Sequence, residues 1–288
     1  MSTPNGSGPA SAPGDRPAVD HPAVDHRAAV AAQTARFVEA VKGADLTTPV
    51  PSCPGWTLAD LVQHAGSVQR WFSVLLRQRL QERPTSRDVE LRLPAGPEGL
   101  ADWLAASADE AADAFAATPA DLPMWAWGAD QHARFWARRM LFETLVHRVD
   151  AEVALGVPSA IDTALAVDGV DEFLVNLPFA AFFAPGTANL RGDDKAIRFS
   201  CTDADRDWLV RLRPDGFGLD GSGLDGFGLD DSGLDGSGAT DAPADATVRG
   251  SAADLLLLAY GRLDRADQRF EVQGDEELLA LWFANSAF

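Results

Sequence analysis

Side chains that bind metal ions recur at helical spacing in this 288-residue sequence. Glu143 and His147 are four residues apart, so both lie on the same face of a helix. Arg139 precedes them by one turn on that face, and Asp150 follows close to it. His64 interrupts an apolar helical stripe, so we expect its imidazole to face the interior of a bundle. Two imidazoles and one carboxylate form a ligand set for zinc or another divalent metal.

The same spacing is also typical of structures without a metal. A histidine on an apolar face is often a hydrogen-bonded core residue, and a Glu–His pair four residues apart often lies on a surface. His132 is eleven residues before Glu143, about 16 Å along a helix, which is too far to share an ion. We expect Cys53 and Cys201 to be packed as small hydrophobic residues rather than to act as catalytic thiols.

Five stretches with a helical apolar period must position these residues. A short connector with three prolines, Pro49, Pro51 and Pro54, precedes a capping-box pattern at Thr57 and Asp60. The expected helices cover about Arg27–Lys42, Thr57 to beyond Leu75, Pro97–Ala117, Gln131–Leu155, and Ile161 to just before Pro178. The long amphipathic helices with short connections predict a four-helix bundle.

After about residue 189 the pattern changes to short alternating segments. The expected strands are Ala196–Cys201, Trp208–Arg213, Asp245–Gly250 and Arg269–Gln273, and the expected helices are Ala252–Arg262 and Glu276–Phe283. We therefore predict a two-domain α+β protein, with a helical domain at 27–188 and a smaller α+β domain at 189–288.

Two segments have a biased composition. Residues 1–26 are rich in Pro, Ser, Gly and Ala and predict a disordered tail, although His21 and His26 repeat at a spacing of five. Residues 214–245 repeat a Gly/Asp-rich unit of five residues, unlike the nine-residue repeat of calcium-binding β-rolls. We expect this second segment to be a flexible insertion that enlarges a hairpin loop.

The net charge of −19 argues against a nucleic-acid binder and against adsorption to an anionic membrane. About half of this charge belongs to the two biased segments. The start of the chain has no secretory pattern, and the most apolar later stretch, Ala252–Tyr260, is too short to span a bilayer. We expect a cytoplasmic protein, either a monomer or a small homo-oligomer.

Three blocks of the sequence resemble the mycothiol-dependent maleylpyruvate isomerase family, a DinB/YfiT-like group of metal-binding four-helix bundles. The blocks are VPSCPGWTLADLVQH at 50–64, FWARRMLFETLVHRVDAE at 135–152 and AVDGVDEFL at 166–174. Residues 248–262 and 272–276 resemble the smaller, sterol-carrier-like domain of that family. The chain departs from the family in its Gly/Asp repeat and at Phe142, where many members have histidine.

The resemblance implies a function for the ligand set. His64, Glu143 and His147 take the positions of the family's divalent-metal ligands, usually zinc, and mycothiol is the thiol cosubstrate. A thiol next to zinc loses its proton at neutral pH. In the isomerase reaction the thiolate adds to the cis double bond of maleylpyruvate, allows rotation and leaves; relatives transfer the thiol instead.

Two further residues receive candidate roles. Asp150 either orients His147 or binds the sugar part of mycothiol, and Arg262 either grips a substrate carboxylate or is a surface arginine at a helix end. The expected partners are a small-molecule thiol and a small electrophilic or carboxylate substrate. The alternatives are a non-catalytic metal-binding bundle with a regulatory role and a metal-free helical scaffold with an acidic interaction loop.

Overall fold

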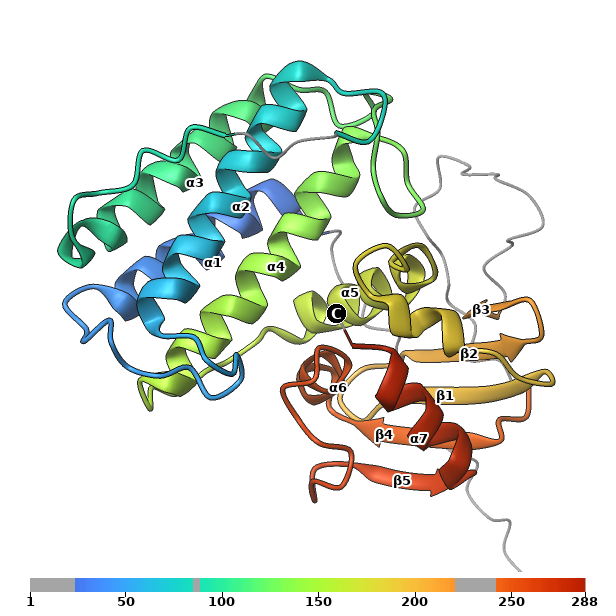
Figure 1. Cartoon of the computed structure of the whole chain (residues 1–288). Coiled ribbons are helices and arrows are strands. Elements are labelled where there is room, and N and C mark those ends of the chain that lie inside the picture. Colours follow the sequence, from blue (N-terminus) through green and yellow to red (C-terminus); the bar gives the residue numbers. More distant parts are fainter. Residues whose placement is uncertain (1–23, 85–88, 221–241, 288) are drawn as a thin grey trace, which may run out of the picture.

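The computed structural model of the chain describes residues 24–84, 89–220 and 242–287 and has an N-terminal bundle of four helices (Figure 1). These are α1 (His26–Val41), α2 (Leu58–Gln78), α3 (Leu100–Ala116) and α4 (Ala133–Ala154). Helix α1 packs against α4 and α3, and α2 packs against the same two helices. The predicted bundle and fold class are confirmed.

The first two helices begin at residues that satisfy their free backbone amides. Thr57 and Asp60 form the predicted capping box at the start of α2. Asp25 caps α1, whose first residue is His26, and the His26 imidazole lies 2.7 Å from a carboxylate oxygen of Asp168. The prediction of a disordered tail up to residue 26 is therefore wrong for its last residues, because the side chains of Asp25 and His26 fix the start of α1. Residues 1–23 of this predicted tail lie outside the described part of the chain.

The C-terminal half contains a five-stranded sheet with the order β3-β2-β1-β4-β5. Its strands are β1 (Lys195–Cys201), β2 (Asp207–Arg213), β3 (Gly216–Leu219), β4 (Ala246–Gly250) and β5 (Glu271–Gly274). Neighbouring strands are antiparallel except β1 and β4, which are parallel. The helices α6 (Ala252–Ala259) and α7 (Glu276–Asn285) both pack against β1, the central strand, and its neighbour β4.

Strand β3 corrects the prediction for the Gly/Asp repeat. We expected a flexible hairpin loop over 214–245, but residues 216–219 pair with β2 and bury Phe217. Asp220 then accepts hydrogen bonds from Arg211. The connection from β3 to β4 is not a hairpin, because β2 and β1 lie between those two strands in the sheet. The rest of the repeat, 221–241, lies outside the described residues.

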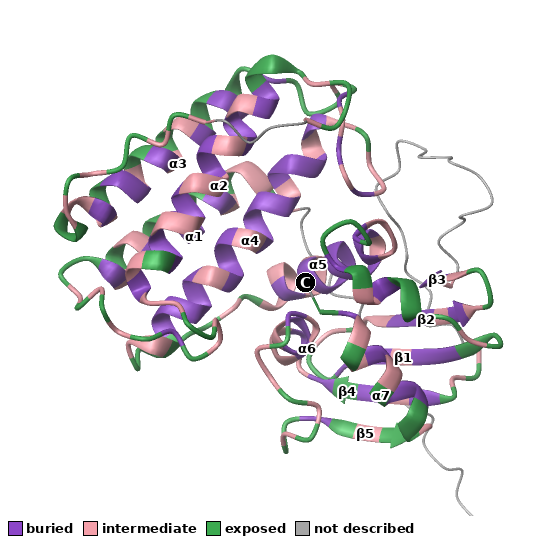
Figure 2. Cartoon of the chain, in the orientation of Figure 1, coloured by how far each residue is buried: buried purple, intermediate pink, exposed green. Residues whose placement is uncertain are grey.

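Helix α5 (Thr163–Asn176) lies between the bundle and the sheet and packs chiefly against α6 (Figure 1). Gly169 permits this approach, because a Cβ at this position would lie 2.8 Å from atoms of Phe142 and Leu256. Buried residues run along α2, α4 and the central strands, so one core continues from the bundle into the sheet (Figure 2). The division at residue 188 stays a prediction. Among the described residues, no helix is both long and apolar enough to cross a membrane.

Candidate metal centre

Three side chains from α2 and α4 converge on one point. Glu143 Oε1 lies 2.9 Å from His64 Nε2 and 3.3 Å from His147 Nε2. The ring centroids of the two histidines are 4.9 Å apart and the rings are nearly perpendicular. One nitrogen or oxygen atom of each of the three residues lies within 4.8 Å of the others, so the group can hold a metal ion.

One separation in this group fits a tetrahedral ion, and the other is a hydrogen bond of 2.9 Å between Glu143 Oε1 and His64 Nε2. Zinc with ligand distances of about 2.1 Å holds neighbouring ligand atoms about 3.4 Å apart, close to the separation between Glu143 Oε1 and His147 Nε2. His147 Nδ1 lies 2.9 Å from Asp150 Oδ2, so it carries the ring proton of the neutral imidazole. The Nε2 lone pair then faces another acceptor, Glu143 Oε1. Either a proton or a metal cation must separate these two acceptors.

The electrostatics of these side chains agree with this geometry. Burial alone raises the pKa of Glu143, but hydrogen bonds with His147 and His64 and the charges of His147 and Arg139 hold that pKa well below its usual range. Burial lowers the pKa of His147, but hydrogen bonds to Asp150, Cys53 and Glu143 raise it well above the usual value. These pKa shifts favour an ionised Glu143 carboxylate with a positive charge next to it.

Asp150 lies behind His147 and is completely buried. It accepts hydrogen bonds from the Ser52 hydroxyl at 2.6 Å and from the Cys53 thiol at 3.6 Å. Burial raises its pKa, but the bonds with His147 and Arg262 outweigh burial and keep the pKa well below the usual range. Both oxygens of Asp150 are thus engaged by side chains of this chain.

Arg262, in the turn after α6, reaches the bundle from the C-terminal half. Its Nε and Nη2 bind the two oxygens of Asp150 at 3.0 and 2.8 Å, and its Nη1 donates to the carbonyl of Tyr260. One of the two candidate roles of this fork was to grip a substrate carboxylate, and in the structure it holds a carboxylate of the same chain. Only 16% of the Arg262 side chain is exposed, so it is not a surface arginine.

Cys53 packs against the core cluster around Val50 and Leu61, as expected. Its thiol also has polar contacts that were not expected, because it lies between Asp150 Oδ2 and Arg262 Nη2, which donates to it at 3.7 Å. The turn Cys53–Trp56 places it there, closed by a hydrogen bond from the Trp56 amide to the Cys53 carbonyl. Gly55 has a φ of +85°, as the third residue of a type II turn requires. Cys201 is buried, as expected.

The Trp56 ring covers both histidines. Its centroid lies 5.0 Å from that of His64 and 6.3 Å from that of His147, with the latter pair stacked. Contacts between rings at these distances favour the observed orientations of both imidazoles.

Two family models match almost the whole described chain. Residues 27–152 match the mycothiol maleylpyruvate isomerase N-terminal domain, and residues 164–281 match the MDMPI C-terminal domain. The chain belongs to the mycothiol-dependent maleylpyruvate isomerase family. It is therefore homologous to an enzyme, mycothiol-dependent maleylpyruvate isomerase. A comparison of its sequence with curated proteins gives no match.

Two solved structures of mycothiol-dependent maleylpyruvate isomerase have the same fold. One is a histidine-to-alanine mutant with a TM-score of 0.56, and the other is the unmutated enzyme with a TM-score of 0.54. Each is 14% identical to this chain, and each match covers 87% of this chain and 93% of the other.

In this member of the maleylpyruvate isomerase family, the five predicted site residues form one cluster. His64, Glu143 and His147 meet directly, Asp150 binds His147, and Arg262 binds Asp150. His132 lies apart, before the start of α4, with its imidazole 2.6 Å from Asp130. Phe142 is completely buried in the core.

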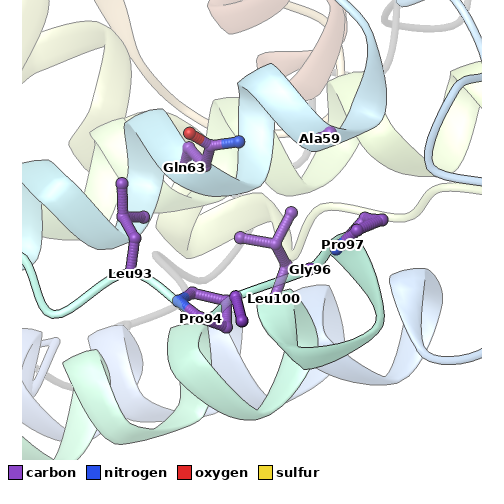
Figure 3. Close-up of a pocket in the computed structure, with 8 residues that line it drawn as sticks. Ala59, Gln63, Leu93, Pro94, Gly96, Pro97 and Leu100 are labelled. Carbon is purple, nitrogen blue, oxygen red and sulfur yellow. The ribbon is translucent and has the colours of Figure 1, made fainter.

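Four residues next to this cluster were not predicted from the sequence. Ser52 and Trp56 contact Asp150 and the histidines, and Glu172 and Tyr260 contact Arg139. The first two lie in the VPSCPGW block and the other two in later blocks that resemble the isomerase family, which is the signal that marks them. A cavity of about 250 Å³ lies elsewhere, between the first turns of α2 and residues 93–100 (Figure 3). Gln63 lines it, whereas the neighbouring His64 does not.

Proposed function

We propose that the chain binds one divalent metal ion, zinc above all, through His64 Nε2, Glu143 Oε1 and His147 Nε2. The observation that carries this proposal is that Glu143 Oε1 faces an imidazole nitrogen from each of two helices while the other nitrogen of His147 is anchored on Asp150. Two imidazoles and one carboxylate leave a coordination position for a substrate.

We further propose that mycothiol is the thiol substrate and that the product is a cis–trans isomer or a thiol-transfer product. A bound zinc ion would supply the positive charge that makes the thiol a thiolate at neutral pH. In the isomerisation, the sulfur forms a bond to one carbon of the cis double bond and the electron pair moves toward the conjugated carbonyl. Rotation about the resulting single bond and cleavage of the C–S bond give the trans isomer.

The protein's own side chains have defined tasks in this proposal. Asp150 holds the proton of His147 on Nδ1 and keeps Nε2 directed at the ion position. Arg262 and Ser52 fix the Asp150 carboxylate, and Trp56 packs against the rings of both histidines. Asp150 and Arg262 are thus positioning residues, because they act through His147.

A turnover assay with mycothiol and zinc tests the activity. We expect the chain to convert maleylpyruvate to its trans isomer, or to transfer mycothiol to another small electrophile, and the His147→Ala variant to lose this turnover. A matched His132→Ala variant, altered outside the cluster, should keep it. Metal binding without turnover on any tested electrophile would contradict the enzymatic part and support a non-catalytic metal-binding protein.

A further inference from the structure

A second set of contacts reaches the metal ligands from the C-terminal half. Arg139 Nη2 donates to Glu143 Oε2 at 3.2 Å. On its other side, Arg139 Nη1 donates to Glu172 Oε2 of α5 at 2.7 Å and to the Tyr260 hydroxyl at 2.6 Å. The Tyr260 hydroxyl donates to Glu172 Oε2 at 3.3 Å. Contacts therefore run without a gap from the end of α6 to Glu143.

The residues that make these contacts are much more buried than Glu143, which they support. The exposed fraction of the side chain is 1% for Glu172 and 6% for Arg139, against 24% for Glu143. Asn176 also donates to the Glu172 carboxylate, at 3.2 Å. A buried ion pair with its hydrogen bonds satisfied has few alternative arrangements, because any other leaves a charge unpaired.

The two oxygens of the Glu143 carboxylate have different partners. Oε2 binds Arg139, whereas Oε1 faces both histidine Nε2 atoms. The guanidinium therefore fixes the rotation of the carboxylate and leaves one oxygen for the ion. It also withdraws charge from the carboxylate, so the ligand strength of Oε1 depends on Arg139.

We infer that Tyr260 and Glu172, acting through Arg139, orient Glu143 toward the metal position, so that the C-terminal half sets the metal affinity of the helical bundle. This inference rests on the proposed function and deepens it. Arg139, Glu172 and Tyr260 are positioning residues. Partners behind a metal ligand typically change metal affinity by 10- to 100-fold when they are removed.

The neighbouring arginine provides a matched control. Arg138 also lies on α4, is mostly buried and binds carboxylates of α5, those of Asp168 and Asp171, but it does not contact Glu143 in the described structure. We therefore compare Arg139→Lys with Arg138→Lys. Tyr260→Phe removes only a hydroxyl, so it tests the same contacts if Arg139→Lys does not fold. Trp208→Phe, which removes another buried hydrogen bond to α5, is its control.

The measurement is the zinc Kd of the full chain by chelator competition, together with the visible absorption spectrum of the cobalt-substituted protein. We expect Arg139→Lys and Tyr260→Phe to raise the Kd about 10-fold or more and to shift the cobalt bands. The control variants should alter neither quantity, even where they lower the melting temperature.

Two results would overturn the inference. Unchanged Kd values and cobalt spectra in both Arg139→Lys and Tyr260→Phe, with zinc bound by the wild type, would refute it and leave the proposed function standing. A wild-type chain that binds no zinc would refute the proposed function and the inference together.

Discussion

At the scale of single residues, His147 is the point where the contacts of the site meet. Its Nδ1 is bound by Asp150, its Nε2 faces Glu143, and Trp56 stacks on its ring. The ring is thus held on three sides. Under the proposed function, a metal ion at this position would take the place of the proton on His147 Nε2.

The raised pKa of His147 predicts a pH dependence of zinc binding. In the metal-free protein the imidazolium persists above the ordinary pKa of 6.5, so the stability it confers is complete below that pH and is lost as the pH rises through the raised value. Zinc requires the neutral ring. We expect zinc affinity to rise about tenfold per pH unit in this range, measured by chelator competition. A pH-independent Kd between about pH 6 and 8 would contradict this.

The two cysteines should differ in reactivity. Burial, and then the negative charges of Asp203 and Asp207, raise the pKa of Cys201 to about 12, whereas Cys53 is partly exposed beside Arg262. We expect iodoacetamide to label Cys53 in the native protein at pH 8 and to leave Cys201 unmodified, because the thiolate is the nucleophile. Peptide mass spectrometry with Cys53→Ser as the control locates the label. Preferential labelling of Cys201 would refute this.

At the scale of elements, α5 connects the bundle to the sheet through close packing at Gly169. A methyl group there would lie 2.8 Å from Phe142 and Leu256. We expect Gly169→Ala to lower the free energy of unfolding by about 1–3 kcal/mol, as measured by urea denaturation. In the Phe142→Leu background the cost should be smaller, because part of the clash is gone. Equal costs in both backgrounds would show that Phe142 is not the obstacle.

The elements also differ in how well sequence predicts them. Helices α1, α2 and α3 were predictable because each buries one face, which gives an apolar period in the sequence. Helix α4 is buried on most of its sides, and its length and apolar content predicted it. Strand β3 was missed because its four residues, Gly-Phe-Gly-Leu, belong to a glycine-rich repeat and pair only with β2. The parallel pairing of β1 with β4 depends on residues far apart in the chain and has no local signal.

The candidate ligands were predictable for the same reason as the helices, since spacing places Glu143 and His147 on one face. The groups around them were not predictable from periodicity. Trp56 and Cys53 lie in a turn, and Tyr260 and Arg262 lie at the end of α6, so only the folded chain brings them to the histidines.

At the scale of the whole molecule, the proposed metal position joins α2 to α4, and its supporting residues join both to the C-terminal half. A metal that binds only the folded chain should therefore stabilise the whole protein. Zinc at 100 times its Kd adds about 2.7 kcal/mol to the free energy of unfolding. We expect a chelator to lower the melting temperature of the wild type but not of His147→Ala. Equal shifts in both proteins would contradict this coupling.

The metal content of the purified chain tests the central claim most directly. Elemental analysis of protein expressed with zinc should find about one zinc ion per wild-type chain, because His64, Glu143 and His147 offer one ligand atom each to one position. The His147→Ala variant should contain almost none, while His132→Ala should match the wild type. Equal, near-zero zinc in the wild type and in His147→Ala would contradict the account.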